Sequence, residues 1–212
     1  MNPRETRWKK SQIHEKAYYE EGLNVKWNVP HSLEYWRDFL RLDGVTGKGL
    51  EIGCGLNGLY KFDRDVLGID PIDFSYVAPN FRLGIGEEVP LEDQSVDYVV
   101  CSNVLDHTAN PEKVLREIFR VSSYLVLWTY VWPSWLASFM QRYDEVHPHH
   151  FTREEVYSML DKFSVDYVKK VNYTFYTSHL QYVKYLPFRA KLVVAHLLGV
   201  RGLLLHVKRR DK

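Results

Sequence analysis

Cysteine and net charge are both scarce in this chain of 212 residues. It has two cysteines, and 28 Lys and Arg residues face 27 Asp and Glu residues, which leaves a formal net charge of +1. Two cysteines cannot form a disulfide framework or a cysteine cage around a metal. A balanced charge provides no general field for a nucleic acid, so we expect no nucleic-acid partner.

Long apolar runs are also missing. A bilayer-spanning helix needs about 18 or more apolar residues, and the nearest candidate, residues 124–140, is interrupted by Thr129, Pro133 and Ser134. The first residues are polar and charged and have no secretory signal pattern. We therefore expect a cytoplasmic protein.

Short apolar runs alternate with helical patterns along the chain. The alternation predicts an α/β fold with a doubly wound, mainly parallel sheet, whose ligands bind at the carboxyl ends of the strands. Caps are predicted at Ser32, at Asn110 and, as a capping box, at Thr152 and Glu155. The predicted strands are 49–53, 66–70, 81–85, 96–101, 124–129, 164–173 and 202–208, and the predicted helices are 11–20, 32–42, 110–121, 152–160 and 188–198.

A glycine turn follows the first predicted strand. Residues 50–58 read LEIGCGLNG, a G-x-G-x-x-G pattern that NAD-binding proteins share. Glu51 precedes the first glycine by two residues, and a carboxylate there suits a cationic ligand group and repels a pyrophosphate. Asp70 ends the next strand, where a carboxylate can accept hydrogen bonds from both hydroxyls of a ribose.

Over residues 46–165 the chain resembles the class I S-adenosylmethionine-dependent methyltransferases, especially their small-molecule group. The motifs that carry the resemblance are LEIGCG at 50–55, GID at 68–70, EEVPLEDQSVDYVV at 87–100, NVLDHTANPEKVLREIFRV at 103–121 and HHFTREEV at 149–156. The resemblance implies a Rossmann-like sheet of about seven strands, with the last strand antiparallel, and S-adenosyl-L-methionine as the cofactor. It implies one domain over 1–212, with an N-terminal helical cap (1–45), a cofactor-binding core (46–130) and an acceptor-side lid with the C-terminal strands (131–212).

The resemblance also implies which residues hold the cofactor. It places Glu51 near the methionine ammonium, Asp70 on the ribose and Asn103 under the methionine portion. The full implied set is Glu51, Gly53, Cys54, Gly55, Asp70, Pro71, Gly86, Glu87 and Asn103.

The sequence departs from the family pattern in two places near this site. Only 11 residues separate Gly58 from Asp70, so the helix after the glycine turn must be very short. Ile85 stands where relatives often carry an acid for the adenine amino group. Gly86 and Glu87 are expected beside the adenine, whose recognition then falls to backbone groups or to Glu87.

Histidines are the candidates for acid–base chemistry. A hydroxyl acceptor usually benefits from a general base, and histidine suits that role near neutral pH. We predict His107 and His150 as catalytic, with helix capping or loop packing as the alternative for each. His147, His149 and His150 crowd around Pro148 but have no clear companion ligands in the sequence, so we predict no metal site.

The acceptor is the least defined part of the prediction. Residues 7–15 resemble the openings of methyltransferases of surface-sugar biosynthesis, which favours O-methylation of a small molecule, glycan or glycolipid. The apolar segment 188–198 either packs between the last strands or forms a peripheral membrane contact. Two other functions stay open, an NAD-dependent oxidoreductase and a non-catalytic relative that binds the cofactor, and the sequence does not define an oligomeric state.

Overall fold

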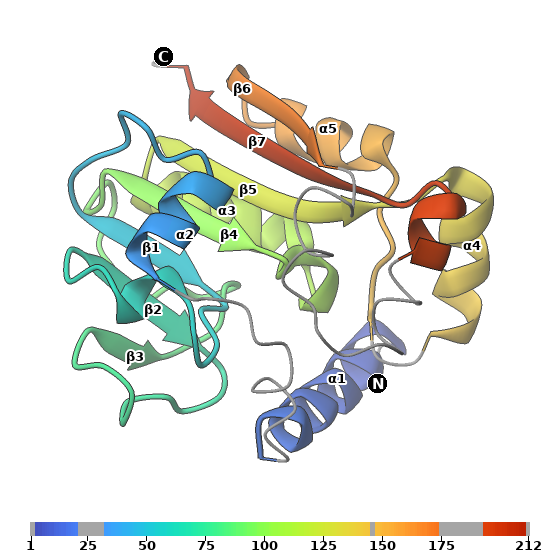
Figure 1. Cartoon of the computed structure of the whole chain (residues 1–212), viewed down its shortest axis with the longest axis horizontal. Helices are drawn as coiled ribbons and strands as arrows, with labels where there is room; N and C mark the ends of the chain where they lie inside the picture. Colours follow the sequence, from blue (N-terminus) through green and yellow to red (C-terminus); the bar gives the residue numbers. More distant parts are fainter. Residues whose placement is uncertain (1–2, 21–31, 145–146, 174–192, 211–212) are drawn as a thin grey trace.

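A seven-stranded sheet carries the fold of the computed structural model, which describes residues 3–20, 32–144, 147–173 and 193–210 (Figure 1). The strand order is β3-β2-β1-β4-β5-β7-β6. The strands are β1 (Gly49–Ile52), β2 (Val66–Asp70), β3 (Phe81–Leu83), β4 (Tyr98–Ser102), β5 (Tyr124–Val131), β6 (Val165–Tyr173) and β7 (Arg201–Arg209).

The pairing confirms the predicted Rossmann-like topology. β1 pairs in parallel with β2 on one side and with β4 on the other, so the strand order reverses between β1 and β4. β7 is antiparallel to both β5 and β6, as predicted for the last strand. Ligands of such sheets bind outside the carboxyl ends of the strands at the point of reversal.

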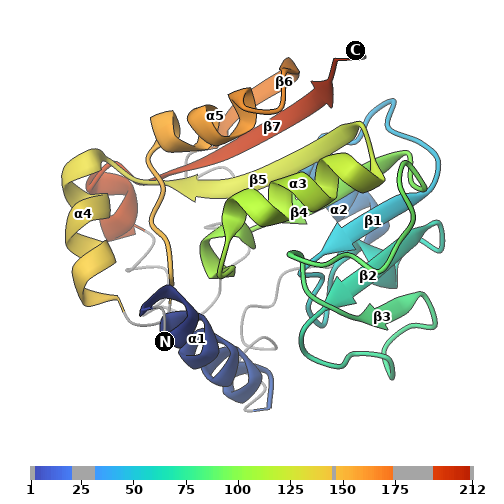
Figure 2. The same cartoon turned by 180° about the vertical axis from the view of Figure 1, so that it is seen from behind.

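Helices cover both faces of the sheet. α2 lies on the face seen in Figure 1, α3 and α5 lie on the face seen in Figure 2, and α1 lies beyond the carboxyl ends of the central strands. The helices are α1 (Pro3–Glu20), α2 (Leu33–Phe39), α3 (Pro111–Val121), α4 (Ser134–Tyr143) and α5 (Arg153–Asp161), with single 3₁₀ turns η2 (Leu59–Lys61) and η3 (Leu105–His107).

Local sequence signals explain where the helices begin. The Asn110 side chain accepts a hydrogen bond from the amide of Lys113 at 3.0 Å, and the Ser32 side chain accepts one from Tyr35 at 3.1 Å. Thr152 and Glu155 form the predicted capping box at the start of α5. Because these bonds satisfy amides that the helix leaves unpaired, all three predicted caps are confirmed.

Several boundaries differ from the predictions. α1 begins at Pro3 rather than at residue 11, and α4 forms where the sequence had shown only an aromatic segment. β5 runs two residues beyond its predicted end, to Val131, because its antiparallel pairing with β7 continues to Arg201. Of the predicted helix 188–198, residues 188–192 lie outside the described residues, and residues 193–197 are helical. Among the described residues, no helix is long and apolar enough to cross a membrane.

Two hydrophobic clusters pack the sheet on its two faces. The larger contains the predicted inner face of α3, from Val114 to Val121, together with Val156 and Leu160 of α5. The other contains Phe39 of α2 and Tyr60 of η2. Packing in both clusters holds the strands in position, and the candidate site lies at the carboxyl ends of these strands.

Removing the α5 cap provides a test of this packing. Thr152→Ala should lower the free energy of unfolding by about 1 kcal/mol, because the amide of Glu155 loses its acceptor. Chemical denaturation measures the change, and Ser158→Ala, in the middle of the same helix, serves as the control. An unfolding free energy equal to that of the unmodified chain would contradict the capping assignment.

Candidate cofactor and acceptor site

The glycine turn after β1 uses a backbone conformation that favours glycine. Gly53 and Gly55 have φ values of 64° and 54°, which lie in the left-handed region. A Cβ on Gly53 would lie 2.4 Å from Val104 Cγ2, and one on Gly55 would lie 2.6 Å from Tyr19 Oη of α1. Side chains of Val104 and Tyr19 therefore fill the space beside these two glycines, and the loop after β4 and α1 approach the turn closely.

Asp70, at the end of β2, holds this turn in place. Its Oδ2 accepts a hydrogen bond from the amide of Gly55 at 3.0 Å, and its Oδ1 accepts one from Ile72 at 2.9 Å. Burial raises the pKa of Asp70 to about 6, although both amides favour the charged form. Each carboxylate oxygen can accept a further bond, so Asp70 retains the capacity to bind a ribose.

Glu51 lies beneath the turn and is almost fully buried. Its Oε2 accepts a hydrogen bond from the amide of Tyr60 in η2 at 2.9 Å. Burial raises the pKa of Glu51 to about 7. The single turn of η2 confirms that the helix after Gly58 is very short. Contact of Glu51 with a methionine ammonium stays a prediction.

A cavity of about 630 Å³ opens beside Asp70, on the side where β2 and β3 end. Pro71 and Ile85 lie in its wall, and Trp8 of α1 contributes from the other side. The full lining is Trp8, Pro71, Leu83, Gly84, Ile85, Glu88, Val89 and Pro90. Its position next to the carboxylate that is predicted to bind the ribose makes it the candidate adenine pocket.

Gly86 and Glu87 do not line this cavity. Glu87 Oε1 accepts hydrogen bonds from the amides of Ala109 and Asn110 at 2.8 and 3.1 Å and so fixes the start of α3. A Cβ on Gly86 would lie 2.9 Å from Ile52 Cγ2, so Gly86 allows close packing. Their predicted contact with adenine stays a prediction.

Glu88 is the acidic residue that lines the cavity, and the sequence reasoning missed it. Glu88 pairs with Ile85 across a tight turn, and both residues lie in the cavity wall. Glu88 therefore supplies an acid at the place where Ile85 cannot. The tight turn is the feature from which the position of Glu88 could have been predicted. Trp8 was missed as a residue of the cavity wall because only the tertiary position of α1 brings it there.

Asn103 and Cys54 complete the predicted cofactor set. Asn103 has φ 57°, and its Oδ1 is buried with no hydrogen-bond partner among the described residues. An unpaired carbonyl oxygen at the end of β4 suits an ammonium donor. Cys54 and Cys101 are buried free thiols, and burial raises the pKa of both.

α1 is joined to the segment after β4 through His107. Glu15 Oε1 lies 2.7 Å from His107 Nδ1, and Ser11 Oγ lies 3.4 Å from the same nitrogen. Burial alone would lower the pKa of His107, but the carboxylates of Asp106 and Glu15 raise it to about 9. His107 is therefore an imidazolium at neutral pH, which favours its loop-fixing role over that of a base.

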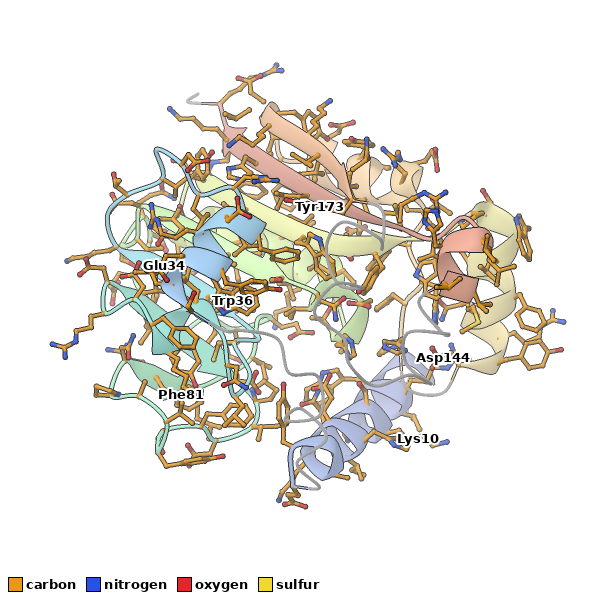
Figure 3. The ribbon with its side chains drawn as sticks, viewed as in Figure 1. Lys10, Glu34, Trp36, Phe81, Asp144 and Tyr173 are labelled. Carbon is orange, nitrogen blue, oxygen red and sulfur yellow. The ribbon has the colours of Figure 1, made fainter. Side chains whose placement is uncertain are left out.

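The second histidine cluster surrounds Asp144, directly after α4 (Figure 3). Asp144 Oδ2 lies 2.7 Å from His147 Nδ1 and 3.0 Å from His150 Nε2. Burial opposes the charge of Asp144, yet its hydrogen bonds to His147 and His150 hold its pKa well below the usual range. His150 Nδ1 is buried and has no partner among the described residues.

The expectation that the histidines lack companion ligands was wrong. Asp106, His107 and His147 offer ligand atoms within 4.8 Å of one another, and so do Asp144, His147 and His150. Asp106 is far away in sequence, so the fold is what brings it to this loop. Each imidazole nevertheless has a carboxylate near it, and hydrogen bonding to these carboxylates accounts for the clusters. A site without a metal stays a prediction.

His149 has a structural role, which the sequence reasoning favoured. Its Nε2 lies 3.0 Å from the carbonyl oxygen of Thr108, and its ring stacks on Phe151 at a centroid distance of 5.3 Å. These contacts join the histidine loop to the segment after β4.

Residues 50–123 match a family model described as a methyltransferase domain. An uncharacterised protein of Methanocaldococcus jannaschii is 30% identical over 80 residues, which cover 35% of this chain and 39% of that protein. The match therefore spans well under half of the curated relative.

The fold is that of the S-adenosylmethionine-dependent class I methyltransferases. An S-adenosylmethionine-dependent methyltransferase of Thermotoga maritima superposes with a TM-score of 0.63 at 16% identity, covering 94% of this chain and 98% of that one. A geranyl diphosphate methyltransferase solved with sinefungin gives 0.67 at 16% identity, covering 84% and 77%. The [4+2]-cyclase SpnF gives 0.62 at 13% identity, covering 85% and 81%.

The residues present fit S-adenosylmethionine, the cofactor of this class. Three features fit parts of this cofactor: the carboxylate of Asp70 fits the ribose, the adjoining cavity fits the adenine, and the unpaired oxygen of Asn103 fits the amino acid portion. Asp70 would hold the ribose, and Pro71 and Ile85 would contact the adenine.

Replacing Asp70 tests the ribose assignment. Asp70→Asn should weaken S-adenosylmethionine binding more than about tenfold, because a charge-assisted contact contributes about 1.5–3 kcal/mol. In the unmodified chain, affinity should fall as the pH drops through the pKa of Asp70, about 6, since protonation removes the charge. Calorimetry measures both effects. The exposed Asp73→Asn is the control, and equal affinities of Asp70→Asn and the control would refute the assignment.

The raised pKa of Glu51 predicts a pH-dependent stability. A carboxyl whose pKa is higher in the folded state, about 7 against an ordinary 4.5, stabilises the fold most at low pH and loses this contribution as the pH rises through 7. Glu51→Gln should therefore reduce the loss of unfolding free energy between about pH 5 and pH 7.5 by roughly 1–3 kcal/mol. Denaturant titrations at both pH values measure it, and an unchanged slope would refute the burial argument.

Proposed function

We propose that this chain transfers the methyl group of S-adenosylmethionine to a hydroxyl oxygen of a small-molecule, glycan or glycolipid acceptor. The observation that carries the proposal is the glycine turn held by Asp70 beside a cavity of about 630 Å³. The methyltransferase domain match at residues 50–123 supports the same activity.

The electrostatics of the turn favour S-adenosylmethionine over a dinucleotide. Dinucleotide-binding folds place a pyrophosphate on free amides at the start of the helix that follows the turn. Here η2 is a single 3₁₀ turn, and Glu51 accepts the amide hydrogen of Tyr60. A phosphate would meet a buried carboxyl there, whereas a cationic cofactor would not be repelled. This argument disfavours the alternative of an NAD-dependent oxidoreductase.

The cofactor supplies a sulfonium-activated methyl group, so the protein's own contribution is alignment and exclusion of water. α1 is suited to that role because Tyr19 approaches the turn and Glu15 pairs with His107. Arg7 further ties α1 to α4, donating a hydrogen bond to the carbonyl oxygen of Gln141 at 2.8 Å. These contacts support a helix that closes over the reacting groups.

His150 is the better candidate for the base that deprotonates the acceptor. Asp144 accepts a hydrogen bond from Nε2 of His150, so in the neutral imidazole ring the free lone pair is on Nδ1. That nitrogen is buried and unpaired among the described residues, so an acceptor hydroxyl would satisfy it. His107, predicted with it, is protonated at neutral pH because its pKa is about 9. The protonated His107 would stabilise the loop, and its positive charge would offset negative charge that develops on the acceptor.

Sequence features support the acceptor class and the location of the reaction. The resemblance of residues 7–15 to enzymes of surface-sugar biosynthesis supports a glycan or glycolipid, and a cytoplasmic location with no nucleic-acid partner stays our expectation. A peripheral membrane contact through 188–198 is supported by residues 193–198, four of which are exposed and apolar. The fold is also found in a cyclase, so a non-methylating relative stays the second candidate.

Separate variants of the two histidines test the chemical assignment. At saturating S-adenosylmethionine, His150→Ala should lower kcat for a hydroxyl acceptor about 10²- to 10⁴-fold, the usual range for general-base catalysis. His107→Asn should leave kcat within about tenfold. Activity is measured by release of S-adenosylhomocysteine across a panel of sugar and lipid-linked acceptors.

Two further results complete that test. Unchanged turnover in EDTA would support the absence of a catalytic metal, and the His150→Ala loss should shrink as the pH rises, because the acceptor ionises without help. Full activity of His150→Ala on a hydroxyl acceptor would remove the proposed base. Cofactor binding without turnover on any acceptor would favour the non-methylating relative.

A further inference from the structure

The loop that follows β3 forms most of the wall of the cavity beside Asp70. We name residues 84–93 the wall loop. All of its residues are described, and none of them belongs to a helix or a strand. Five of the eight residues that line the cavity lie in it, namely Gly84, Ile85, Glu88, Val89 and Pro90. A loop without regular structure takes its shape from the groups that hold it, so the shape of the cavity depends on the attachments of this loop.

Arg120, near the end of α3, holds the wall loop with its guanidinium group. Nη2 donates a hydrogen bond to the carbonyl oxygen of Val89 at 2.9 Å, and Nη1 donates one to that of Leu91 at 2.7 Å. Nη1 also donates to the carboxylate of Asp93 at 2.9 Å. Nε and Nη2 donate to the two carboxylate oxygens of Glu117 at 2.9 and 2.8 Å. A guanidinium has five N–H donors, and these five bonds use all of them.

Glu117 completes the attachment from one turn earlier in α3. Its Oε2 accepts a hydrogen bond from the amide of Val89 at 2.9 Å, so Val89 is held both at its amide and at its carbonyl oxygen. The hydrogen bonds from Arg120 hold the pKa of Glu117 below its ordinary value, which keeps this carboxylate charged. Bidentate, charge-assisted bonds of this kind are stronger and more directional than an ordinary surface ion pair.

Glu88 lies between two residues that are both held to α3. On one side, Glu87 Oε1 accepts hydrogen bonds from the amides of Ala109 and Asn110, where α3 starts. On the other side, Val89 is held near the end of α3 by Glu117 and Arg120. α3, which lies on the face of the sheet seen in Figure 2, therefore fixes the backbone on both sides of Glu88 at the cavity wall.

We propose that Arg120 is a positioning residue for the cofactor, which holds the wall loop in the shape that fits adenine and sets Glu88 where it can accept a hydrogen bond from the adenine amino group. Arg120 does not itself line the cavity, so it acts through Glu117 and the backbone of Val89 and Leu91. The inference rests on the proposed function, because it takes the cavity to be the adenine pocket.

Calorimetry with two nucleoside ligands tests the proposal. S-adenosylhomocysteine has the adenine amino group, whereas S-inosylhomocysteine has an oxygen in its place, which cannot donate a hydrogen bond to a carboxylate. The unmodified chain should bind S-adenosylhomocysteine about tenfold more tightly, which is the effect of one charge-assisted hydrogen bond.

The Arg120→Met variant should change both the affinity and the preference. S-adenosylhomocysteine should bind about fivefold or more weakly, because the wall loop loses its bonds at the carbonyl oxygens of Val89 and Leu91 and must be ordered when the ligand binds. The preference over S-inosylhomocysteine should fall to about threefold or less, since Glu88 is no longer fixed. Arg120→Lys keeps the charge and the fold-stabilising stem, yet it should lose most of the preference because an ammonium cannot form the bidentate pair.

Two control variants separate the steps of the argument. Arg116→Met removes the same charge from an exposed position of α3, and it should bind both ligands like the unmodified chain. Glu88→Gln leaves the attachments of the wall loop in place, but it should reduce the preference, because an amide accepts a hydrogen bond from an amino group and also donates one to an oxygen.

Hydrogen exchange provides a readout that needs no ligand. The Val89 amide, which donates to Glu117, should exchange at least about tenfold faster in Arg120→Met than in Arg116→Met, because the loop opens locally more often. In Glu88→Gln this amide should exchange as in the unmodified chain, since its partner is unchanged.

Three results would overturn the inference while leaving the proposed function intact. The first is an unmodified chain that binds the two ligands equally. The second is Arg120→Met and Arg120→Lys binding both ligands like Arg116→Met. The third is a weakening of both ligands by the same factor in Arg120→Met, with the preference unchanged, because Arg120 would then have a purely structural role. No binding of S-adenosylhomocysteine by the unmodified chain would overturn the proposed function as well.

Discussion

The hydrogen bond between Asp70 and the amide of Gly55 joins the end of β2 to the turn after β1, and β1 is one of the two strands between which the strand order reverses. A carboxylate that is 7% exposed at the end of β2 accepts this bond at 3.0 Å and a second one from Ile72 at 2.9 Å. These bonds set the position of the glycine turn relative to β2. The cavity, whose wall includes Ile85 and Glu88, lies beside that carboxylate. α1 approaches the same turn through Tyr19.

Buried acids give this edge of the sheet its chemical character. Glu51 and Asp70 both have raised pKa values because burial disfavours their charged forms. A cationic ligand would relieve that penalty by compensating the charge. Glu51 also occupies an amide of η2, and so the turn differs from a pyrophosphate-binding turn although both share the same glycine pattern. The glycines alone therefore do not define the ligand; the acids do.

Short-range signals made most of the fold predictable. β2 was predicted at its observed bounds, and the caps at Ser32, Asn110 and Thr152 were found because each depends on residues within three positions in the sequence. The extent of α1 was not predictable in this way. Its side chains at Trp8 and Tyr19 gain their partners from strand ends more than thirty residues away.

The candidate site also combines residues that a local motif identifies with residues that only the fold brings together. The glycine turn and Asp70 were identified because the motif is local, and the structure brings them together. The contact of Glu87 with the adenine stays a prediction, and Glu87 Oε1 accepts hydrogen bonds from the amides of Ala109 and Asn110. Its neighbour Glu88 lines the cavity, and a tight turn pairs Glu88 with Ile85. The carboxylate partners of the histidines are of two kinds, since Asp144 is only three residues before His147, whereas Asp106 reaches the histidine loop only through the fold.

The most direct test of this account is a crystal structure of the chain with S-adenosylhomocysteine. We expect both ribose hydroxyls within hydrogen-bonding distance of the Asp70 carboxylate, the adenine in the cavity lined by Pro71 and Ile85, and the amino group near Asn103 Oδ1. A ligand bound elsewhere, or a ribose with no contact to Asp70, would contradict the central claim that this carboxylate organises the cofactor site.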